Sequence, residues 1–221
     1  MTSPRIRLAG LCWLLPPCRA KNALLTRLGH RVHPSARIGI CVMLDVDEVV
    51  VGADTIIGHG NVFRGLRAVR IGVEAILGQF NWFSRAPSLT LPDDELAGSL
   101  VMGDHSVLTS RHYVDCSGGL WMGRFATVAG VRTTVLSHTI DLGLGRQGTR
   151  PVRLSDRVFV GSNATMMPGT TAAAGAVFAA GSVTALDGEY AAGMLYGGVP
   201  AKQIKPIDGA YFHRTRTWSS Q

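Results

Sequence analysis

The sequence predicts an all-β chain built from many short, repeated strands. Pairs of an aliphatic residue and a glycine recur six positions apart, as in Val51-Gly52 and Ile57-Gly58, and again in Ile71-Gly72 and Leu77-Gly78. Apolar positions recur every three or four residues in a helix and every two in an ordinary strand, so a period of six fits neither. It fits a short strand followed by a turn, with one inward aliphatic side chain per unit and small residues at the corners.

The composition agrees with this prediction. Of the 221 residues, 46% are hydrophobic, 17% are charged, 7% are aromatic, and 27 are glycine. The hydrophobic share is large enough to bury a core, which excludes disorder throughout the chain. Small, uncharged and glycine-rich chains with few aromatic residues suit all-β repeats better than helical bundles. The apolar runs are also far shorter than the ~20 residues that a membrane-spanning helix needs.

The first element along the chain is a basic N-terminal arm with a capping helix, over residues 1–30. Residues 1–44 hold seven basic side chains and no acidic one, whereas the rest of the chain holds 15 of each, so the net charge of +7 belongs to this end. A nucleic-acid-binding body would instead spread its basic residues over a folded face, so we expect no nucleic-acid partner. An anionic membrane surface could bind through residues 1–37, with Trp13 at the interface.

We expect a cytoplasmic location, with peripheral contact at the inner face of the membrane left open. The apolar stretch Leu8–Leu15 is only eight residues long and is followed by two prolines, which does not suit a secretion signal. The four cysteines form no CxxC pair and fit no zinc site, so we expect free thiols and no bound metal.

Two caps are predicted because the open ends of a stacked-coil fold expose strand edges and core. Residues 18–29 are expected to form a short helix over the first coil. Residues 207–221 are expected to form a C-terminal cap or tail. The predicted helix places Leu24, Leu25 and Leu28 at helical spacing, with Lys21 and Arg27 outside.

Between the caps, the six-residue frames run through residues 31–206, which we interpret as one domain. Two breaks interrupt them: residues 85–100, with two prolines and an acidic run, and the glycine-rich residues 141–151. We expect both to be loops, and loops on a rigid scaffold often carry functional sites. The predicted inward positions are Val32, Ile38 and Leu44; Val51, Ile57 and Phe63; Met102, Leu108 and Val114; Met122, Val128 and Thr134; and Leu154, Val160, Met166, Ala172, Phe178 and Thr184.

The late coils resemble those of a known family. The stretch from Val158 to Gly169, its continuation Gly181-Ser182-Val183 and the exit Gly198–Lys202 are similar to the closing coils of the hexapeptide-repeat acyltransferases. The resemblance covers about residues 32–206. It implies a left-handed parallel β-helix with three hexads per triangular turn, a homotrimer, and acetyl-CoA as acyl donor. Ala172 and Thr184 depart from the pattern as poor inward residues, which suggests narrow or loose last turns.

Two His-x-x-Asp units are the candidates for chemistry, His112–Asp115 and His138–Asp141. The second directly precedes a frame break and resembles the catalytic segment of O-acetyltransferases that act on bacterial surface polysaccharides. This resemblance implies that His138 removes the proton of an acceptor hydroxyl, here of a sugar or glycolipid. A neutral imidazole with a pKa near ~6.5 is a competent base. A carboxylate at its other nitrogen would fix the tautomer, and Asp141 or Asp115 could supply it. We assign His138 and Asp141 as the catalytic residues.

His112, Asp115 and Asn81 are candidates for binding the acceptor, with a structural role as the open alternative. His112 and His138 are 26 residues apart, or four hexads plus two, which in strict register places them on adjacent faces. In the family that the chain resembles, sites form between neighbouring subunits of a trimer, so two faces can meet there.

For the donor, the resemblance implies a groove along the late coils. Pantetheine would bond to backbone groups, and lysines at the exit from the coil would meet the phosphates. No Walker or dinucleotide glycine loop is present, because the glycines here are corner residues. The assigned donor-site residues are Gly161, Ser162, Ala179, Ala180, Lys202 and Lys205.

Two other functions remain open at this point. A γ-type carbonic anhydrase shares the implied fold but needs three histidines converging on zinc. His105, His112 and His138 are available, although their spacings of 7 and 26 are not multiples of the repeat. The third function is a non-catalytic trimeric β-helix scaffold.

Overall fold

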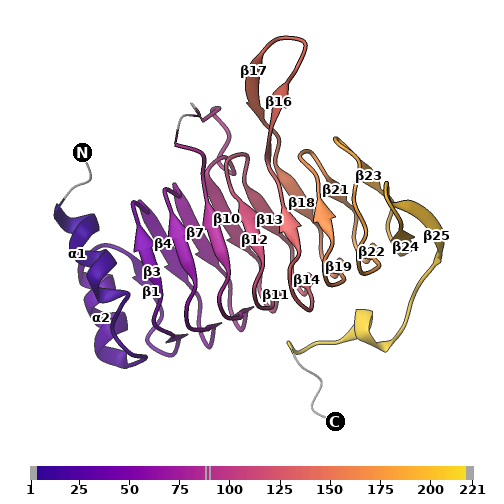
Figure 1. The fold of residues 1–221 in the computed structure, drawn as a ribbon. Coiled ribbons are helices and arrows are strands. Elements are labelled where there is room, and N and C mark those ends of the chain that lie inside the picture. Colours follow the sequence, from indigo (N-terminus) through magenta and orange to yellow (C-terminus); the bar gives the residue numbers. More distant parts are fainter. Residues whose placement is uncertain (1–3, 88, 90, 218–221) are drawn as a thin grey trace.

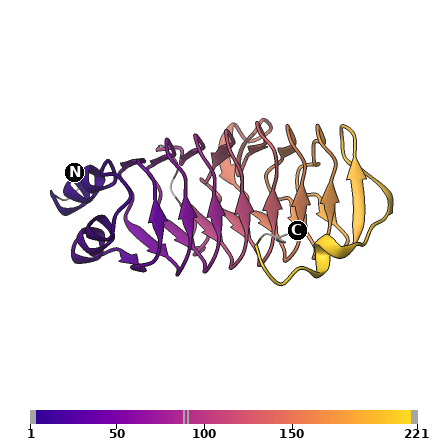
Figure 2. The same ribbon diagram turned by 90° about the horizontal axis from the view of Figure 1, so that it is seen from below.

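The chain winds into a left-handed parallel β-helix, which confirms the predicted fold class (Figures 1 and 2). The computed structural model describes residues 4–87, 89 and 91–217, with side chains from Leu8 onward. Three parallel sheets, here named A, B and C, form the three faces, and each of the first six coils contributes one strand to each face. None of the described helices has the length and apolar character needed to cross a bilayer.

The strands of each sheet follow one another in chain order. Sheet A contains β1 (Arg31–Val32), β4 (Glu48–Val51), β7 (Ala68–Ile71), β10 (Ser99–Met102), β13 (Leu120–Met122), β18 (Val152–Leu154), β21 (Thr171–Ala172) and β23 (Glu189–Tyr190). Sheet B contains β2 (Arg37–Ile38), β5 (Ile56–Ile57), β8 (Ile76–Leu77), β11 (Val107–Leu108), β14 (Thr127–Val128), β19 (Phe159–Val160), β22 (Val177–Phe178), β24 (Met194–Gly197) and the antiparallel β25 (Lys202–Pro206). Sheet C contains β3 (Val42–Leu44), β6 (Val62–Arg64), β9 (Trp82–Ser84), β12 (Tyr113–Asp115), β15 (Thr134–Val135) and β20 (Thr165–Met166).

The inward residues match the predicted frames except at two positions. Leu44 is 48% exposed, and Met43 fills the core in its place. Thr134 is likewise replaced by Val135, which is fully buried. The physical reason is the length of the corner between sheets B and C. The inward residue follows Ile38 after five positions in the first coil and follows Val128 after seven in the fifth, so a strict period of six fails at both.

The glycine of each aliphatic-glycine pair is required by the stacking of coils. A Cβ atom at Gly52 would lie 2.6 Å from the carbonyl carbon of Gly72 in the next coil. One at Gly58 would lie 2.6 Å from the carbonyl oxygen of Gly78. Because the obstacle is backbone, no rotamer change can relieve the clash.

The N-terminal end is closed by α1 (Pro4–Cys12), which the sequence analysis did not predict, and α2 (Arg19–Arg27), which it did. Trp13 is fully buried above the first coils, with its ring 6.4 Å from that of Phe63. Its predicted place at a membrane interface is therefore wrong.

Lys21 was expected on the outside of α2, but it is fully buried. Its Nζ donates to the carbonyl oxygens of Trp13, Leu15, Ile38 and Gly39 at 2.8–3.3 Å. The carbonyls of Ile38 and Gly39 belong to the first coil, which has no preceding coil to bond, and those of Trp13 and Leu15 belong to the cap. Burial lowers the pKa of Lys21, partly offset by the nearby Cys41. The ammonium group thus satisfies the open end of the β-helix.

The C-terminal end is filled by aromatic residues. Phe178, Tyr190 and Tyr196 pack with ring centroids 4.9–5.7 Å apart, so the space left by the small Ala172 is occupied and the last turns are not loose. The tail then runs back along the side of the β-helix (Figures 1 and 2), through the short helix η1 (Ala210–His213). Thr217 at its end donates to the carbonyl oxygen of Glu74, and Trp218 lies outside the described residues.

Both frame breaks leave the β-helix at the corner between sheets C and A (Figure 1). The first lies between β9 and β10. The second was predicted as a loop but is an antiparallel hairpin of β16 (His138–Asp141) and β17 (Arg146–Thr149). This corner, with both excursions, carries the candidate site.

Candidate functional site

The site begins with a histidine and a carboxylate that strand pairing brings together. Asp115 ends β12, and His138 lies three residues beyond the inward residue of β15. Because β12 pairs with β15, with Val114 opposite Val135, the two side chains emerge at the same corner of neighbouring coils. His138 Nδ1 lies 2.7 Å from Asp115 Oδ2.

The Asp115 carboxylate is held from several sides. Its Oδ1 accepts from the backbone N–H and the hydroxyl of Ser117, at 3.0 and 2.6 Å. Its Oδ2 accepts from the backbone N–H and the hydroxyl of Ser137, at 2.8 and 3.1 Å. Burial on its own raises the pKa of Asp115, but the bonds from Ser117, His138 and Ser137 outweigh it and leave the pKa below its usual value. The group is therefore a fixed anion.

This anion sets the chemistry of His138. A carboxylate can only accept, so Nδ1 of His138 carries the proton and the lone pair of the neutral ring is on Nε2. The side chain is 33% exposed, and none of the described residues hydrogen-bonds Nε2. The pair can therefore accept a proton from a group that approaches from outside, while Asp115 stabilises the resulting cation.

The geometry corrects the carboxylate assigned from sequence. Asp141 is exposed at the other end of β16, where its Oδ1 accepts from the backbone N–H groups of Gly143 and Leu144 at 3.0 and 2.9 Å. It shapes the tip of the hairpin and does not touch His138. The partner is Asp115, from the other His-x-x-Asp unit.

His112 and Asn81 are buried in a ladder between coils, with 2% and 1% exposure. His112 Nδ1 accepts from the backbone N–H of Thr133 at 3.0 Å, and its Nε2 lies 2.9 Å from Thr109 Oγ1. Asn81 Oδ1 accepts from the His112 N–H at 2.8 Å, and Asn81 itself bonds to Asn61. These contacts correspond to the structural alternative, and neither side chain has a polar atom left for an acceptor in this structure.

The predicted donor residues gather at a different corner, between sheets B and C. Gly161 and Ala179 directly follow the neighbouring strands β19 and β22 there, and a Cβ atom on Gly161 would lie 2.7 Å from the backbone nitrogen of Ala180. Ser162 follows in the same turn, and its carbonyl accepts from Gly181. Lys202 and Lys205 are exposed on β25. In one chain, the width of sheet C separates these residues from His138.

A cavity of ≈ 480 Å³ lies on the outer face of sheet A beside the His138 corner. Its floor is the outward row Arg70, Val101, Trp121 and Arg153, which strand register places side by side. Its wall is the first excursion, where the Asp94 carboxylate lies 3.7 Å from Arg153. A Cβ atom on Gly119 would lie 2.1 Å from the Leu96 carbonyl oxygen, so this excursion packs directly on the turn that follows Asp115.

Sequence reasoning missed three residues here, namely Ser117, Ser137 and Trp121. A signal existed for the first: Asp115-x-Ser117 has the spacing at which a carboxylate bonds the backbone two residues on. Ser137 and Trp121 acquire their places only through strand register.

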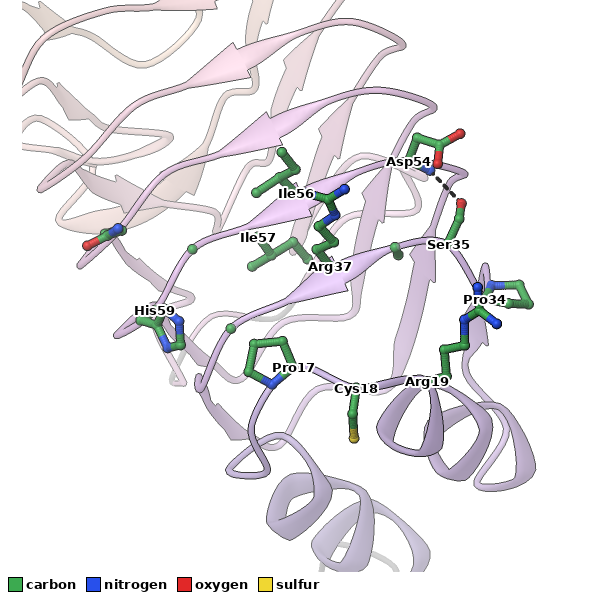
Figure 3. A pocket seen from close by; sticks show the side chains of 14 residues that line it. Pro17, Cys18, Arg19, Pro34, Ser35, Arg37, Asp54, Ile56, Ile57 and His59 are labelled. Atoms are coloured by element: carbon green, nitrogen blue, oxygen red, sulfur yellow. Dashed lines mark hydrogen bonds between the residues drawn. The ribbon is translucent and has the colours of Figure 1, made fainter.

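Another cavity, of ≈ 630 Å³, lies at the N-terminal end beside α2 (Figure 3). The three histidines considered for zinc also lie apart from one another in the chain: His105 stacks on Phe125, His112 is buried, and His138 pairs with Asp115. Among the residues that the structure describes, no group of three histidine, cysteine or acidic side chains could hold a metal ion.

Solved structures share the fold. The chain is similar to the polysialic acid O-acetyltransferase OatWY, with a TM-score of 0.59 and 13% identity, over 87% of each chain. It is similar to the N-acyltransferase AntD from Bacillus cereus in complex with dTDP and coenzyme A, with a TM-score of 0.50 and 17% identity, over 76% of this chain and 84% of that chain. No protein-family model and no curated protein matches the sequence. The chain therefore has the β-helix fold that these two acyltransferases adopt.

Proposed function

We propose that the chain is an acyl-CoA-dependent O-acyltransferase that transfers acetyl from acetyl-CoA to a sugar hydroxyl of a surface glycan or its precursor. The observation that carries the proposal is the His138–Asp115 pair, with its 2.7 Å contact and its exposed imidazole. The fold supports it, because OatWY and AntD are acyltransferases and AntD was crystallised with coenzyme A.

The reaction needs one base and no protein nucleophile, because the thioester is already activated. Nε2 of His138 takes the proton from the acceptor hydroxyl as its oxygen attacks the thioester carbonyl carbon. The tetrahedral intermediate collapses, the carbon–sulfur bond breaks, and the leaving thiolate takes the proton from the imidazolium to give free CoA. Asp115 stabilises the imidazolium between these two transfers.

We further propose that the working unit is a homotrimer. The donor residues around Gly161 and Ala179 and the base His138 lie on two different corners of one β-helix, so a single chain does not bring both to one point. A neighbouring copy would place its donor corner opposite the His138 corner of the first, with its Lys202 and Lys205 near the CoA phosphates. Sedimentation should then give close to three times 23.5 kDa.

For the acceptor, the cavity beside this corner supports a sugar. Trp121 offers an indole against which the C–H face of a sugar ring can stack, and Arg153 and Asp94 supply hydrogen-bond donors and acceptors around it. His112 and Asn81 are left as structural residues in this proposal.

The experiment is a screen of nucleotide sugars and lipid-linked sugars with acetyl-CoA, following thiol release, with His138→Ala beside the wild type. We expect turnover to fall by roughly 10² or more, because general bases contribute about 10²–10⁴, while acetyl-CoA binding is unchanged. His213→Ala is the matched control, since His213 also pairs with a carboxylate, Asp208, at 2.9 Å but on the exposed tail. Near-normal turnover of His138→Ala would remove the base from the proposal.

A further inference from the structure

The cap at the N-terminal end exposes far more apolar surface than closing a coil requires. Within α1, Ala9 and Cys12 face the core, as does Trp13 directly after it. Leu8 and Leu11, three positions apart in α1, lie away from this buried side, and Leu14 and Leu15 follow the end of the helix. The exposed leucines of the cap are Leu8 at 52%, Leu11 at 63%, Leu14 at 48%, Leu15 at 39% and Leu24 at 38%.

The first 44 residues carry seven basic side chains and no acidic one, and these basic side chains lie in different environments. Lys21 is used inside the cap, and Arg31 pairs with Glu48 at 2.6 Å. Arg19 and Arg27 remain exposed on α2. The side chains of Arg5 and Arg7, in the first turn of α1, are not described.

Arg19 and Arg37 line the ≈ 630 Å³ cavity beside the cap, as Figure 3 shows. Asp54 is the one carboxylate among its lining residues, so two positive charges minus one negative leave a net charge of +1 with His59 neutral. Pro17 and Cys18, which follow the exposed Leu14 and Leu15, line the same cavity. Basic and apolar groups are therefore contiguous.

We propose that this end of the β-helix docks on an anionic phospholipid surface, with the cap leucines at the acyl boundary and the arginines among the headgroups. Apolar side chains flanked by an excess of basic groups have the character of interfacial helices. Each arginine near an anionic leaflet adds attraction, which salt screens. A protein partner of mixed charge would have no acidic side chain within residues 1–44 to pair with its own basic groups. The docking does not depend on the acyl-transfer chemistry.

The test is co-sedimentation of the full chain with vesicles of phosphatidylcholine alone and of equal parts phosphatidylcholine and phosphatidylglycerol, at low and high salt. We expect binding to the anionic vesicles only, weakened by salt. The double variant Leu8→Gln and Leu11→Gln should lose roughly ten-fold or more in partitioning, since each buried methylene contributes. Arg19→Gln should lose about five-fold at low salt and little at high salt.

The hairpin offers a matched control. Leu142 and Leu144 are 91% and 63% exposed at its tip, so Leu142→Gln with Leu144→Gln removes leucines at least as exposed as Leu8 and Leu11, far from the cap. Thermal melting checks that every variant is folded. Equal recovery of wild type with both vesicle types, or an equal loss in the hairpin variant, would overturn the proposal. Because acetyl-CoA binding is measured separately on the same variants, a failed docking does not count against the acyltransferase.

Discussion

Two histidines of the same sequence motif end in opposite environments. His112 and His138 each stand three residues before an aspartate, yet one is 2% exposed and the other is exposed on a third of its side chain. Burial lowers the pKa of His112 to about 4. Nδ1 of His138 lies against the Asp115 carboxylate, whereas no described residue hydrogen-bonds its Nε2.

The difference teaches that the partner of each ring nitrogen decides what a histidine does. The Nδ1 of His112 is an acceptor for a backbone N–H, so its proton sits on Nε2 and is donated to Thr109 Oγ1, inside the protein. The Nδ1 of His138 is a donor to Asp115, so its basic nitrogen is Nε2, which points away from Asp115. The hydrogen-bonded pair is crossed, joining the aspartate of the first motif to the histidine of the second.

The largest effect should come from breaking the crossed pair with Asp115→Asn. An amide at this place cannot be a fixed anion, and its NH₂ group favours the wrong tautomer of His138. We expect turnover to fall roughly 10²-fold or more with acetyl-CoA affinity retained. Steady-state kinetics and calorimetric binding measure the two quantities. If kcat stayed within a few-fold of wild type, Asp115 would be only a structural residue.

The second test substitutes His112, the buried histidine of the comparison. His112→Leu leaves the Thr133 N–H without its partner, at a cost of about 1–3 kcal/mol for an unsatisfied buried group. The Thr109 hydroxyl still donates to the carbonyl oxygens of Val128 and Gly130. His112→Asn should cost less, because its Oδ1 can still accept from Thr133. His138→Leu, at a half-buried position, should cost less than His112→Leu, because Asp115 keeps its bonds from Ser117 and Ser137. Denaturant titration of the three variants separates a structural from a surface histidine.

The lowered pKa of His112 predicts that the free energy of unfolding depends on pH. The pKa of His112 is lower in the folded state, so the unfolded chain binds the proton first as the pH falls. Its stabilising contribution is complete above pH ~6.5 and is lost as the pH falls towards about 4, by roughly 3 kcal/mol. Asp115, whose pKa is also lowered, adds a further loss only at more acidic pH. In His112→Asn the fall between pH ~6.5 and 4 should shrink, and an unchanged slope would assign the effect to other groups.

A smaller effect is expected for Trp121, which lines the cavity proposed to bind the acceptor. Trp121→Ala should raise the acceptor KM roughly ten-fold, equivalent to ~1.4 kcal/mol, with kcat and the KM for acetyl-CoA little changed. Trp82→Ala is the matched control, because Trp82 is 41% exposed on the outer face of sheet C. Equal effects of the two substitutions would mean that the cavity on sheet A holds no acceptor.

The sequence could predict most of the fold, because the six-residue period follows from local spacing. It failed at Leu44 and Thr134, where corners of five and seven residues shift the inward position by one. The site was predicted less completely, since its pairing is non-local. Val114 and Val135 are opposite one another at a separation of 21 residues, not the 18 of three strict hexads. Counting hexads could therefore find both motifs but could not show that Asp115 and His138 share a corner.

The smallest effect is expected for Asp141→Asn, and it is the sharpest test of the crossed pairing. Asp141 belongs to the same motif as His138, yet its carboxylate oxygen accepts only from the N–H groups of Gly143 and Leu144 among the bonds that the structure describes. An asparagine Oδ1 can accept both of these bonds, so the hairpin turn should be kept and turnover should change by less than about two-fold. Asp115→Asn, measured beside it, removes the same charge at the other motif. A loss for Asp141→Asn as large as that for Asp115→Asn would mean that the hairpin rearranges during the reaction and brings its own carboxylate to the base. A loss confined to Asp115→Asn would mean that strand pairing, and not the motif, selects the partner of His138.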